Sequence, residues 1–575
     1  MKFKILILIV GLTFFVQLVN LQIVHYHRFQ SLAMKNIVGI ETIPAPRGMI
    51  YDRNGNIIAD SYPVYTLFIY PKQFSESQMS QLVKLTGLKR EIIQKKLKKN
   101  YRIVRIGKLS LPVASKIEEI LDEFPGVRVK IEPVRYYYSD KIVSHFIGYT
   151  GEASPAEIKK GELPKISPAD IIGKMGIEKE YNNLLTGKKG VEYYQVDVLG
   201  RITGKIPGIK DLSPKIGNSL CLTIDMDLER YTDSLFKNYK RGAVIAMNPR
   251  TGEILIYYSK PGIPINQIVY ERNEQIWKSL ITSEDAPLFD RISQGQYPSG
   301  SIFKIITAAI GLKNNIVNKE TRFKPCTGGI YIGNKYMACW KAHGSLDLID
   351  AIIQSCDVYF YQLGMKIGLD TFSFDARKLG FGSITGIDLP EEKTGLIPDR
   401  DWYNRYFSKK GWGKGVAANL AIGQGEVLVT PLQMVKFFSG IANMGVTYSP
   451  HLLKYALSPT GKRIYKPRLQ EVQLPIEKSS IALLRDAMLG VIENPKGTAH
   501  WTKIPGVKVC GKTGTAQNPH GKDHSLFVAF APYENPTIVV FVVVENAGHG
   551  STVAAPIAMK IINKYIKREV KIKNE

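Results

Sequence analysis

Ser301 and Lys304 have the spacing at which two side chains of a helix share one face. The run 302–312 is apolar nearly all round, which is typical of a helix buried in a core. Burial penalises the charged form of a lysine and lowers its pKa. A neutral amine beside a hydroxyl can accept its proton, so Ser301 could be a nucleophile. Taken alone, these residues favour a simpler alternative, in which Ser301 caps a helix and Lys304 reaches solvent.

The short motifs that could accompany this pair each occur more than once. Ser-x-x-Lys also occurs at 234–237, in the amphipathic, surface-type sequence LERYTDSLFKNYK. Lys-Thr-Gly begins at Lys393, in the polar loop PEEKTGLIPDR, and again at Lys512, after the strand-like VKVCG. Ser-x-Asp occurs four times, and only the copy at 355–357 lies between two apolar helical runs. No motif is specific by itself, so the prediction depends on their combination.

The copies with suitable surroundings form one ordered set: Ser301–Lys304, Ser355–Cys356–Asp357 and Lys512–Thr513–Gly514. This order is the signature of serine β-lactamases and penicillin-binding proteins. We expect Ser301 to attack a carbonyl and form an acyl-enzyme, with Lys304 accepting its proton. Ser355 can relay a proton to the leaving amine, and Asp357 would orient that hydroxyl and a lysine.

The segment from Lys512 to Thr515 is predicted to bind the substrate as an edge strand. Lys512 and the hydroxyls of Thr513 and Thr515, with Gly514 between them, can hold a substrate carboxylate. Backbone N–H groups of Ser301 and Thr515 would then form an oxyanion hole, in which one donor is typically worth on the order of 3–4 kcal/mol of barrier.

The N-terminal sequence predicts a membrane anchor. Residues 5–24 form a mostly apolar segment long enough to cross a bilayer as a helix. Lys2 and Lys4 precede it, which favours a cytoplasmic tail of residues 1–4 and export of the remainder. The alternative is a cleaved signal peptide, but the following NLQIVHYHRF contains no small-x-small cleavage site.

The chain of 575 residues has a formal net charge of +26, which suits nucleic acid, an anionic membrane or an anionic substrate. No basic low-complexity arm, zinc-finger spacing or RNA-binding aromatic motif accompanies this charge, so we do not expect nucleic acid as a partner.

Four residues have a spacing that can hold a metal: Cys326, Cys339, His343 and Cys356, in the pattern C-x12-C-x3-H-x12-C. A Cys₃His set is a known composition for structural zinc. Two alternatives stay open: a disulfide between Cys326 and Cys339 in an oxidising periplasm, and a Cys356 that is only a small buried residue. We expect no cofactor for catalysis.

The expected fold is α+β. Polar turns at 52–55 and 248–252 predict β-hairpins, and the Pro- and Gly-rich run 202–219 predicts a linker. Strands at both ends of the C-terminal part enclose helices, which predicts an antiparallel sheet flanked by helices. The expected boundaries are a tail (1–4), an anchor (5–24), an N-terminal domain (25–219) with a small α+β insert (about 66–134), and a catalytic domain (220–570).

The chain resembles the class B penicillin-binding proteins, specifically the penicillin-binding protein 2 type of the elongation machinery. The resemblance covers nearly the whole chain and includes RGMIYDRNG (47–55), YPSGSIFK (297–304), AIGQGEVLVTPLQM (421–434) and GKTGTAQ (511–517). It implies a mostly β, elongated pedestal domain of the dimerisation type at 25–219, followed by a serine β-lactamase/transpeptidase-like domain. Asp357 stands where many relatives have asparagine, and an acidic residue is common in the elongation type.

The resemblance also implies an activity and partners. The activity is that of a peptidoglycan D-Ala-D-Ala transpeptidase that acts on stem peptides and is inhibited by β-lactams. The pedestal would contact a membrane glycan polymerase, in a single-pass protein of the bacterial cytoplasmic (inner) membrane with its catalytic domain in the periplasm. A DD-carboxypeptidase or β-lactamase would share these motifs. A β-lactam sensor would need a cytoplasmic segment longer than four residues, and an inactive scaffold would not need intact motifs.

Overall fold

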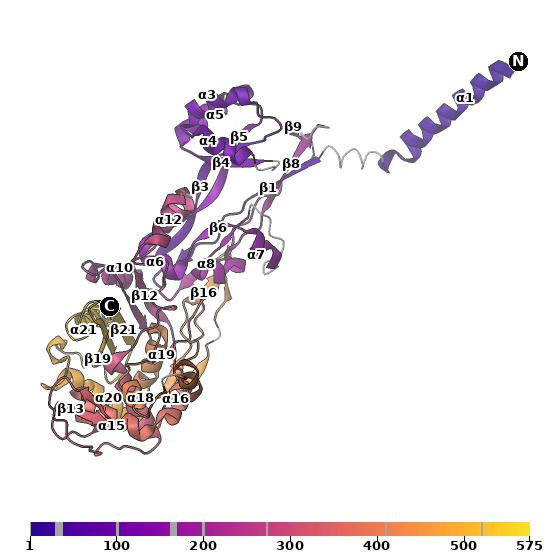
Figure 1. Cartoon of the computed structure of the whole chain (residues 1–575). Helices are drawn as coiled ribbons and strands as arrows, with labels where there is room; N and C mark the ends of the chain where they lie inside the picture. Colours follow the sequence, from indigo (N-terminus) through magenta and orange to yellow (C-terminus); the bar gives the residue numbers. More distant parts are fainter. Residues whose placement is uncertain are drawn as a thin grey trace. The chain divides into compact units, whose positions relative to one another are not determined.

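The computed structural model describes residues 2–28, 38–98, 103–160, 170–197, 202–206, 208–271, 274–408, 411–467, 469–518 and 521–574. The chain forms two compact units, and many of their elements are labelled in Figure 1. The first unit contains residues 1–48, 61–136 and 186–218, and the second contains 49–60, 137–185 and 219–575. The segments 49–60 and 137–185, which precede the expected boundary between residues 219 and 220, therefore belong to the second unit.

The N-terminal helix is apolar and exposed. Helix α1 (Lys2–Val19) continues as the π-helical turn η1 (Asn20–Val24). Residues Phe3–Val24 are long and apolar enough to cross a membrane, and none of the most apolar stretch is buried in the protein. The segment predicted as an anchor, 5–24, lies within this helix.

The first unit combines a three-stranded sheet with the small α+β insert. Strands β1 (Val38–Ile43), β8 (Gly190–Val196) and β9 (Ile202–Lys205) are antiparallel, in the order β1-β8-β9. The prediction of a linker was wrong for residues 202–205, because Lys205 pairs with Tyr194 and extends the sheet. In the insert, the later part of β3 (Ile57–Ile69) pairs with β4 (Val104–Leu109) and β5 (Val127–Tyr137). A separate apolar core holds these strands to the helices α3 (Met79–Thr86), α4 (Arg90–Leu97), α5 (Leu111–Glu119) and η3 (Leu121–Glu123), and η2 (Glu76–Gln78) leads into α3.

The second unit is built on the predicted antiparallel sheet, in the order β12-β11-β21-β20-β19. The hairpin β11 (Gly242–Met247) and β12 (Ile254–Lys260) comes from the beginning of the catalytic region. Strands β19 (Cys510–Ala516), β20 (His524–Ala531) and β21 (Ile538–Val544) come from its end. The continuous apolar sequences of β11 and β21 fit a sheet that is covered on both faces.

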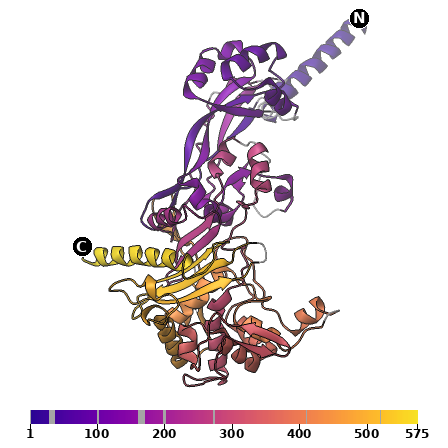
Figure 2. The ribbon, with the colours of Figure 1, turned by 60° about the vertical axis from the view of Figure 1, so that its left-hand side comes forward.

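Helices cover the two faces of this sheet (Figure 2). The C-terminal helix α21 (Ala554–Asn574) packs on β20 and β21, and α10 (Met226–Leu235) packs on β12 and against α21. Helix α19 (Pro431–Ala442) packs on the other face, and α20 (Lys478–Glu493) contacts β19 and the buried central helix α13 (Phe303–Lys313). The sequence predicted this final helix for about 554–568, and α21 extends beyond that end to Asn574.

The remaining elements of the second unit are short. A side sheet contains β2 (Ile50–Tyr51), the first part of β3, β10 (Ser219–Leu222), β16 (Leu453–Leu457) and β17 (Arg463–Tyr465). Paired strands are β6 (Thr150–Glu152) with β7 (Ile171–Gly173), β13 (Gly329–Ile332) with β14 (Lys335–Ala338), and β15 (Val446–Tyr448) with β18 (Glu471–Gln473). The other helices are α6 (Asp140–Ile147), α7 (Pro155–Lys160), α8 (Gly176–Glu180), α9 (Asn182–Leu185), α11 (Ile265–Glu271), α12 (Glu274–Thr282), η4 (Gly300–Ile302), α14 (Leu348–Ile353), α15 (Asp357–Ile367), α16 (Leu369–Lys378), α17 (Arg400–Tyr406), α18 (Val416–Ala421) and η5 (His500–Thr502).

The hairpin predicted at the turn 52–55 is present between β2 and β3. The buried carboxylate of Asp52 accepts hydrogen bonds from the backbone N–H groups of Asn54 and Asn56, both at 2.8 Å. An aspartate that bonds its own turn in this way stabilises it. The second predicted hairpin, β11–β12, is also present.

Two glycines allow η4, which contains Ser301, to lie against the edge strand β19. A Cβ at Gly300 would lie 2.4 Å from the carbonyl oxygen of Thr515, and one at Gly514 would lie 2.7 Å from that of Ser299. Gly300 also has a φ of 53°, which glycine adopts at little cost. The fold therefore brings Ser301 to the strand of the Lys-Thr-Gly motif.

Candidate active site

Ser301 lies at the entrance to the buried helix, as the sequence predicted. It occupies the short turn η4 immediately before α13 and is partly exposed. Lys304 lies one turn further along, in the first turn of α13, with a fully buried side chain. The alternative in which Lys304 reaches solvent is therefore wrong.

Ser355 forms the junction between α14 and α15, and Asp357 is the first residue of α15. The backbone φ of Ser355 is 54°, a left-handed conformation that residues other than glycine seldom adopt. Such a conformation costs on the order of 1–3 kcal/mol and persists where the surroundings enforce it, often at functional sites. The sequence carries no signal for this backbone conformation.

The three motifs meet at the hydroxyl of Ser355. Lys304 Nζ donates to Ser355 Oγ at 3.1 Å, to the Ser355 carbonyl oxygen at 2.8 Å and to Asp357 Oδ1 at 2.8 Å. Lys512 Nζ donates to the same Ser355 Oγ at 2.9 Å and to the carbonyl oxygen of Thr513 at 3.3 Å. Residues from three distant parts of the sequence therefore form one hydrogen-bond network.

Lys512 has an unusual environment for a lysine. Its side chain is fully buried, and burial lowers its pKa well below the usual value. The charge of Lys304 lowers the pKa further, whereas the carboxylate of Asp357 acts in the opposite direction. Lys512 can therefore lose its proton far more readily than an exposed lysine, and a bound anion would favour its charged form.

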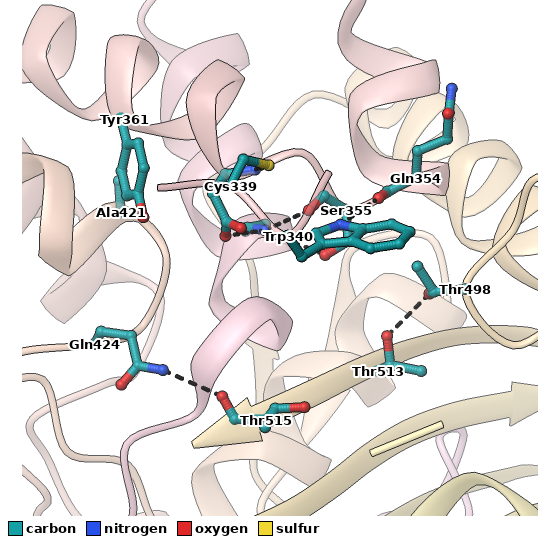
Figure 3. A network of polar contacts seen from close by, with 12 residues as sticks. Cys339, Trp340, Gln354, Ser355, Tyr361, Ala421, Gln424, Thr498, Thr513 and Thr515 are labelled. Carbon is teal, nitrogen blue, oxygen red and sulfur yellow. Dashed lines mark hydrogen bonds and ion pairs between the residues drawn. The ribbon is translucent and has the colours of Figure 1, made fainter. Parts of the chain in front are cut away.

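The edge strand β19 makes two side-chain contacts that the sequence analysis did not predict (Figure 3). Thr513 Oγ1 lies 2.9 Å from Thr498 Oγ1. Gln424 Nε2 donates to the carbonyl oxygen of Thr515 at 3.1 Å. Gln424 lies within a motif that supported the resemblance, whereas no sequence signal singled out Thr498.

Trp340 lies close to Ser355 and was also missed (Figure 3). Its indole Nε1 donates to the carbonyl oxygen of Gln354 at 3.2 Å, while the side chain remains 57% exposed. An exposed indole beside the catalytic motif offers an apolar surface to a bound molecule.

The four predicted metal ligands are brought together. The ligand atoms of Cys326, Cys339, His343 and Cys356 all lie within 4.8 Å of one another. His343 Nδ1 is 3.6 Å from Cys326 Sγ and 3.5 Å from Cys339 Sγ. Tetrahedral zinc with bonds of about 2.3 Å to sulfur and about 2.0 Å to nitrogen separates such ligands by about 3.5 Å, so the donor set fits zinc. All five cysteines are free thiols in the structure.

The cysteine cluster contacts the catalytic motif directly. The backbone N–H of Asp357 donates to Cys339 Sγ at 3.2 Å. Cys356 itself lies between Ser355 and Asp357 in the chain. The cluster is therefore placed to fix the start of α15, from which Asp357 reaches Lys304.

The duplicate motifs lie outside this network. Ser234 is on α10, where its hydroxyl donates to the carbonyl oxygen of Tyr231 in the same helix. Lys393 lies exposed in a loop, where its backbone N–H donates to the carbonyl oxygen of Ser293.

Comparison with known proteins agrees with this geometry. The model of the penicillin-binding protein transpeptidase domain matches residues 242–563, and the model of the penicillin-binding protein dimerisation domain matches residues 42–222. The chain is 34% identical over 573 residues to the peptidoglycan D,D-transpeptidase MrdA of Acinetobacter baumannii, covering 95% of this chain and 84% of the relative.

Solved structures give the same result. The structure of the penicillin-binding protein PBP2 from Helicobacter pylori in complex with MreC has a TM-score of 0.82 and 30% identity, and the match covers 92% of this chain and 99% of that one. A chain of a peptidoglycan synthase complex, described as coordinating polymerization and crosslinking, has a TM-score of 0.72 and 27% identity, with coverage of 98% and 97%. The motifs, their meeting at Ser355 and the extent of these matches show that the chain belongs to the class B penicillin-binding proteins of the PBP2 type.

Proposed function

We propose that this chain is a peptidoglycan D,D-transpeptidase that cross-links stem peptides through an acyl-enzyme on Ser301 during cell-wall elongation. The observation that carries the proposal is the buried network in which Lys304, Lys512 and Asp357 surround the hydroxyl of Ser355. Such a network can move a proton between a nucleophile and a leaving amine. The D,D-transpeptidase activity of the relative from Acinetobacter baumannii supports the same reaction.

In the acylation step, Ser301 Oγ attacks the carbonyl carbon of the penultimate D-alanine. The Oγ–C bond forms, the peptide C–N bond breaks, and the terminal D-alanine leaves as an amine. Lys304 in its neutral amine form accepts the Ser301 proton, and Ser355, which lies 3.1 Å from Lys304 Nζ, delivers a proton to the leaving nitrogen. Lys304 then gives a proton back to Ser355. In sum, one proton leaves the Ser301 hydroxyl and one proton is gained by the leaving amine.

Strand β19 would bind the donor peptide and stabilise the charge that develops. The backbone N–H groups of Ser301 and Thr515 would hold the oxyanion, each worth on the order of 3–4 kcal/mol of barrier. The hydroxyls of Thr513 and Thr515 would hold the terminal carboxylate. Lys512 contributes charge beneath them, and Gly514 keeps this strand close to Ser301.

In the second step, an amine of another stem peptide attacks the ester carbonyl. A new C–N bond forms, the ester C–O bond breaks, and Ser301 Oγ recovers a proton. A β-lactam is attacked in the same way through its ring amide, and the resulting ester stays on Ser301. Attack by water instead of an amine would give DD-carboxypeptidase or β-lactamase activity.

The exposed apolar helix supports a membrane location. We propose that Phe3–Val24 anchors the protein once in the bacterial cytoplasmic membrane, with both compact units on the periplasmic side. The similar structures include a complex with MreC and a complex described as coordinating polymerization and crosslinking. We therefore propose that the first unit contacts a membrane glycan polymerase.

The cysteine cluster supports a structural metal site. We propose that Cys326, Cys339, His343 and Cys356 hold one zinc ion, whose role is to fix the loop before α15 rather than to take part in the reaction. The support is the donor chemistry and the ligand spacing of 3.5–3.6 Å between His343 Nδ1 and two sulfur atoms.

Substitution of Ser301 by alanine should abolish covalent labelling by a fluorescent penicillin, because it removes the hydroxyl on which the proposed acyl-enzyme forms. The matched control is Ser234→Ala, which removes the serine of the other Ser-x-x-Lys motif and should be labelled at the wild-type rate. Gel fluorescence followed by mapping of the labelled peptide measures both. Labelling that persists in Ser301→Ala would place the nucleophile elsewhere, and an unlabelled wild-type protein would favour an inactive scaffold.

Substitution of Lys512 by alanine should slow acylation by a carboxylate-bearing penicillin by roughly 10²-fold or more, because it removes both a proton-transfer partner of Ser355 and the positive charge beneath the carboxylate site. Lys393→Ala is the matched control, since it removes the lysine of the other Lys-Thr-Gly motif. Stopped-flow or competition labelling gives the two rates. Equal effects of the two substitutions would contradict the assignment.

Elemental analysis of the purified full chain should find about one zinc per chain, and thiol counting after denaturation without reductant should find all five cysteines free. Cys326→Ser should lose the metal, whereas Cys510→Ser, which removes a buried cysteine outside the cluster, should retain it. Removal of zinc by a chelator should slow penicillin labelling, because Asp357 is bonded to Cys339. Two missing thiols and no metal would instead establish the disulfide.

The proposed polymerase contact can be tested at exposed apolar side chains of the first unit. Ile40 on β1 and Ile131 on β5 are each 59% exposed, and the neighbouring residues Glu41 and Lys130 form an ion pair between these strands. Ile40→Asp and Ile131→Asp should reduce co-purification of the glycan polymerase with the full chain from detergent. Ile281→Asp, at a 69% exposed site in the second unit, is the control. Equal recovery of the polymerase with all three variants would favour a spacer role for the first unit.

A further inference from the structure

The segment 421–425 connects the two parts of the proposed oxyanion hole. The carbonyl oxygen of Gly423 accepts the N–H of Gly300, the residue before the nucleophile, at 3.0 Å. Gln424, the next residue, donates its side-chain amide to the carbonyl oxygen of Thr515 at 3.1 Å (Figure 3). Two successive residues therefore hold the nucleophile turn and strand β19 at a fixed separation.

This segment is itself held in place by the helix that follows the nucleophile. Thr307 of α13 donates its buried hydroxyl to the carbonyl oxygen of Ala421 at 2.8 Å. At Gly423, φ is 68°, and a Cβ would lie 2.4 Å from the carbonyl oxygen of Gly300. The close packing and the left-handed backbone both require glycine there. The position from which Gln424 reaches Thr515 is thus fixed by the backbone.

Strand β19 needs such support because it is the edge of the sheet. On one side, Thr515 pairs with Ser525 of β20. Its other side faces no further strand among the described residues, and there the Thr515 carbonyl receives the Gln424 amide. A carbonyl oxygen can accept two hydrogen bonds, so this contact leaves one for an extended peptide bound along the strand.

We propose that Gln424 is a positioning residue that fixes the distance between the Ser301 and Thr515 N–H groups, so that both reach the oxyanion of the tetrahedral intermediate. The inference rests on the proposed acyl transfer at Ser301. Gln424 acts through the Thr515 backbone and does not contact the reacting atoms. It should therefore affect the barrier to acylation and not the initial binding of the substrate.

The test uses the full-length protein with two variants at this position. Gln424→Met keeps a similar side-chain length and removes the amide donor, and Gln424→Glu places an anion beside the Thr515 carbonyl at neutral pH. Gln362→Met is the matched control, because its amide also donates to a loop carbonyl, that of Lys324 at 3.1 Å, away from β19. End-point titration with penicillin gives the fraction of active protein, so that loss of fold is not mistaken for a slower reaction.

Both Gln424 variants should acylate at least about 10-fold more slowly at saturating penicillin. Loss of a whole oxyanion donor lowers the rate constant by about 10²–10³-fold, and a displaced donor should lower it by less. The dissociation constant of the complex before acylation should change by less than about 2-fold, as expected for an interaction made only in the transition state. Binding of a boronic acid, whose tetrahedral adduct places an oxygen in the oxyanion hole, should weaken in parallel with the rate. The Gln362→Met protein should match the wild type in all three measurements.

Three results would overturn the inference while leaving the proposed function intact: wild-type acylation rates in both Gln424 variants, a loss confined to initial binding, or an equal loss in Gln362→Met. A wild-type protein that penicillin does not acylate at Ser301 would instead contradict the proposed function itself. The two failures are therefore distinguishable in one series.

Discussion

The structure of the site depends on two buried lysines that share one hydroxyl. Lys304 and Lys512 both donate to Ser355 Oγ, so their nitrogen atoms lie within about 6 Å of one another. At an effective dielectric constant near 20, two ammonium groups at that distance repel by about 3 kcal/mol, and Asp357 is the carboxylate that pairs with Lys304. Burial lowers the pKa of Lys512, and the charge of Lys304 lowers it further, because loss of the Lys512 proton relieves the repulsion. A substrate carboxylate bound at the proposed site would have the opposite effect and would couple substrate binding to proton transfer through one residue.

The fold supplies three rigid supports for this arrangement. Helix α13 holds Lys304 in the core, the junction of α14 and α15 holds Ser355 in a left-handed conformation, and β19 brings Lys512 to it from the sheet edge. The junction and the edge strand are bonded to side chains outside the network. The cysteine cluster bonds Asp357, Thr498 bonds Thr513, and Gln424 bonds the Thr515 carbonyl. The positions of the network residues therefore depend on side chains outside the network.

The sequence predicted the residues of the network better than it predicted their supports. Motif order and local apolar patterns selected Ser301 over Ser234 and Lys512 over Lys393, because burial can be read from neighbouring side chains. The φ of Ser355 could not be predicted, since it results from tertiary packing. Thr498 and Gln424 were missed because a polar residue in a loop gives no local sign of its partner. Strand β9 was mistaken for a linker because its pairing with β8 is decided by the sheet. The cysteine spacing correctly predicted that four ligand atoms come together.

The most direct test of acyl transfer at Ser301 is a crystal structure of the protein after reaction with a penicillin. We expect continuous density from Ser301 Oγ to the opened lactam, with the ester carbonyl oxygen within hydrogen-bond distance of the Ser301 and Thr515 N–H groups. The penicillin carboxylate should lie at the hydroxyls of Thr513 and Thr515. A covalent adduct on another residue, or an ester on Ser301 whose carbonyl points away from both N–H groups, would contradict it.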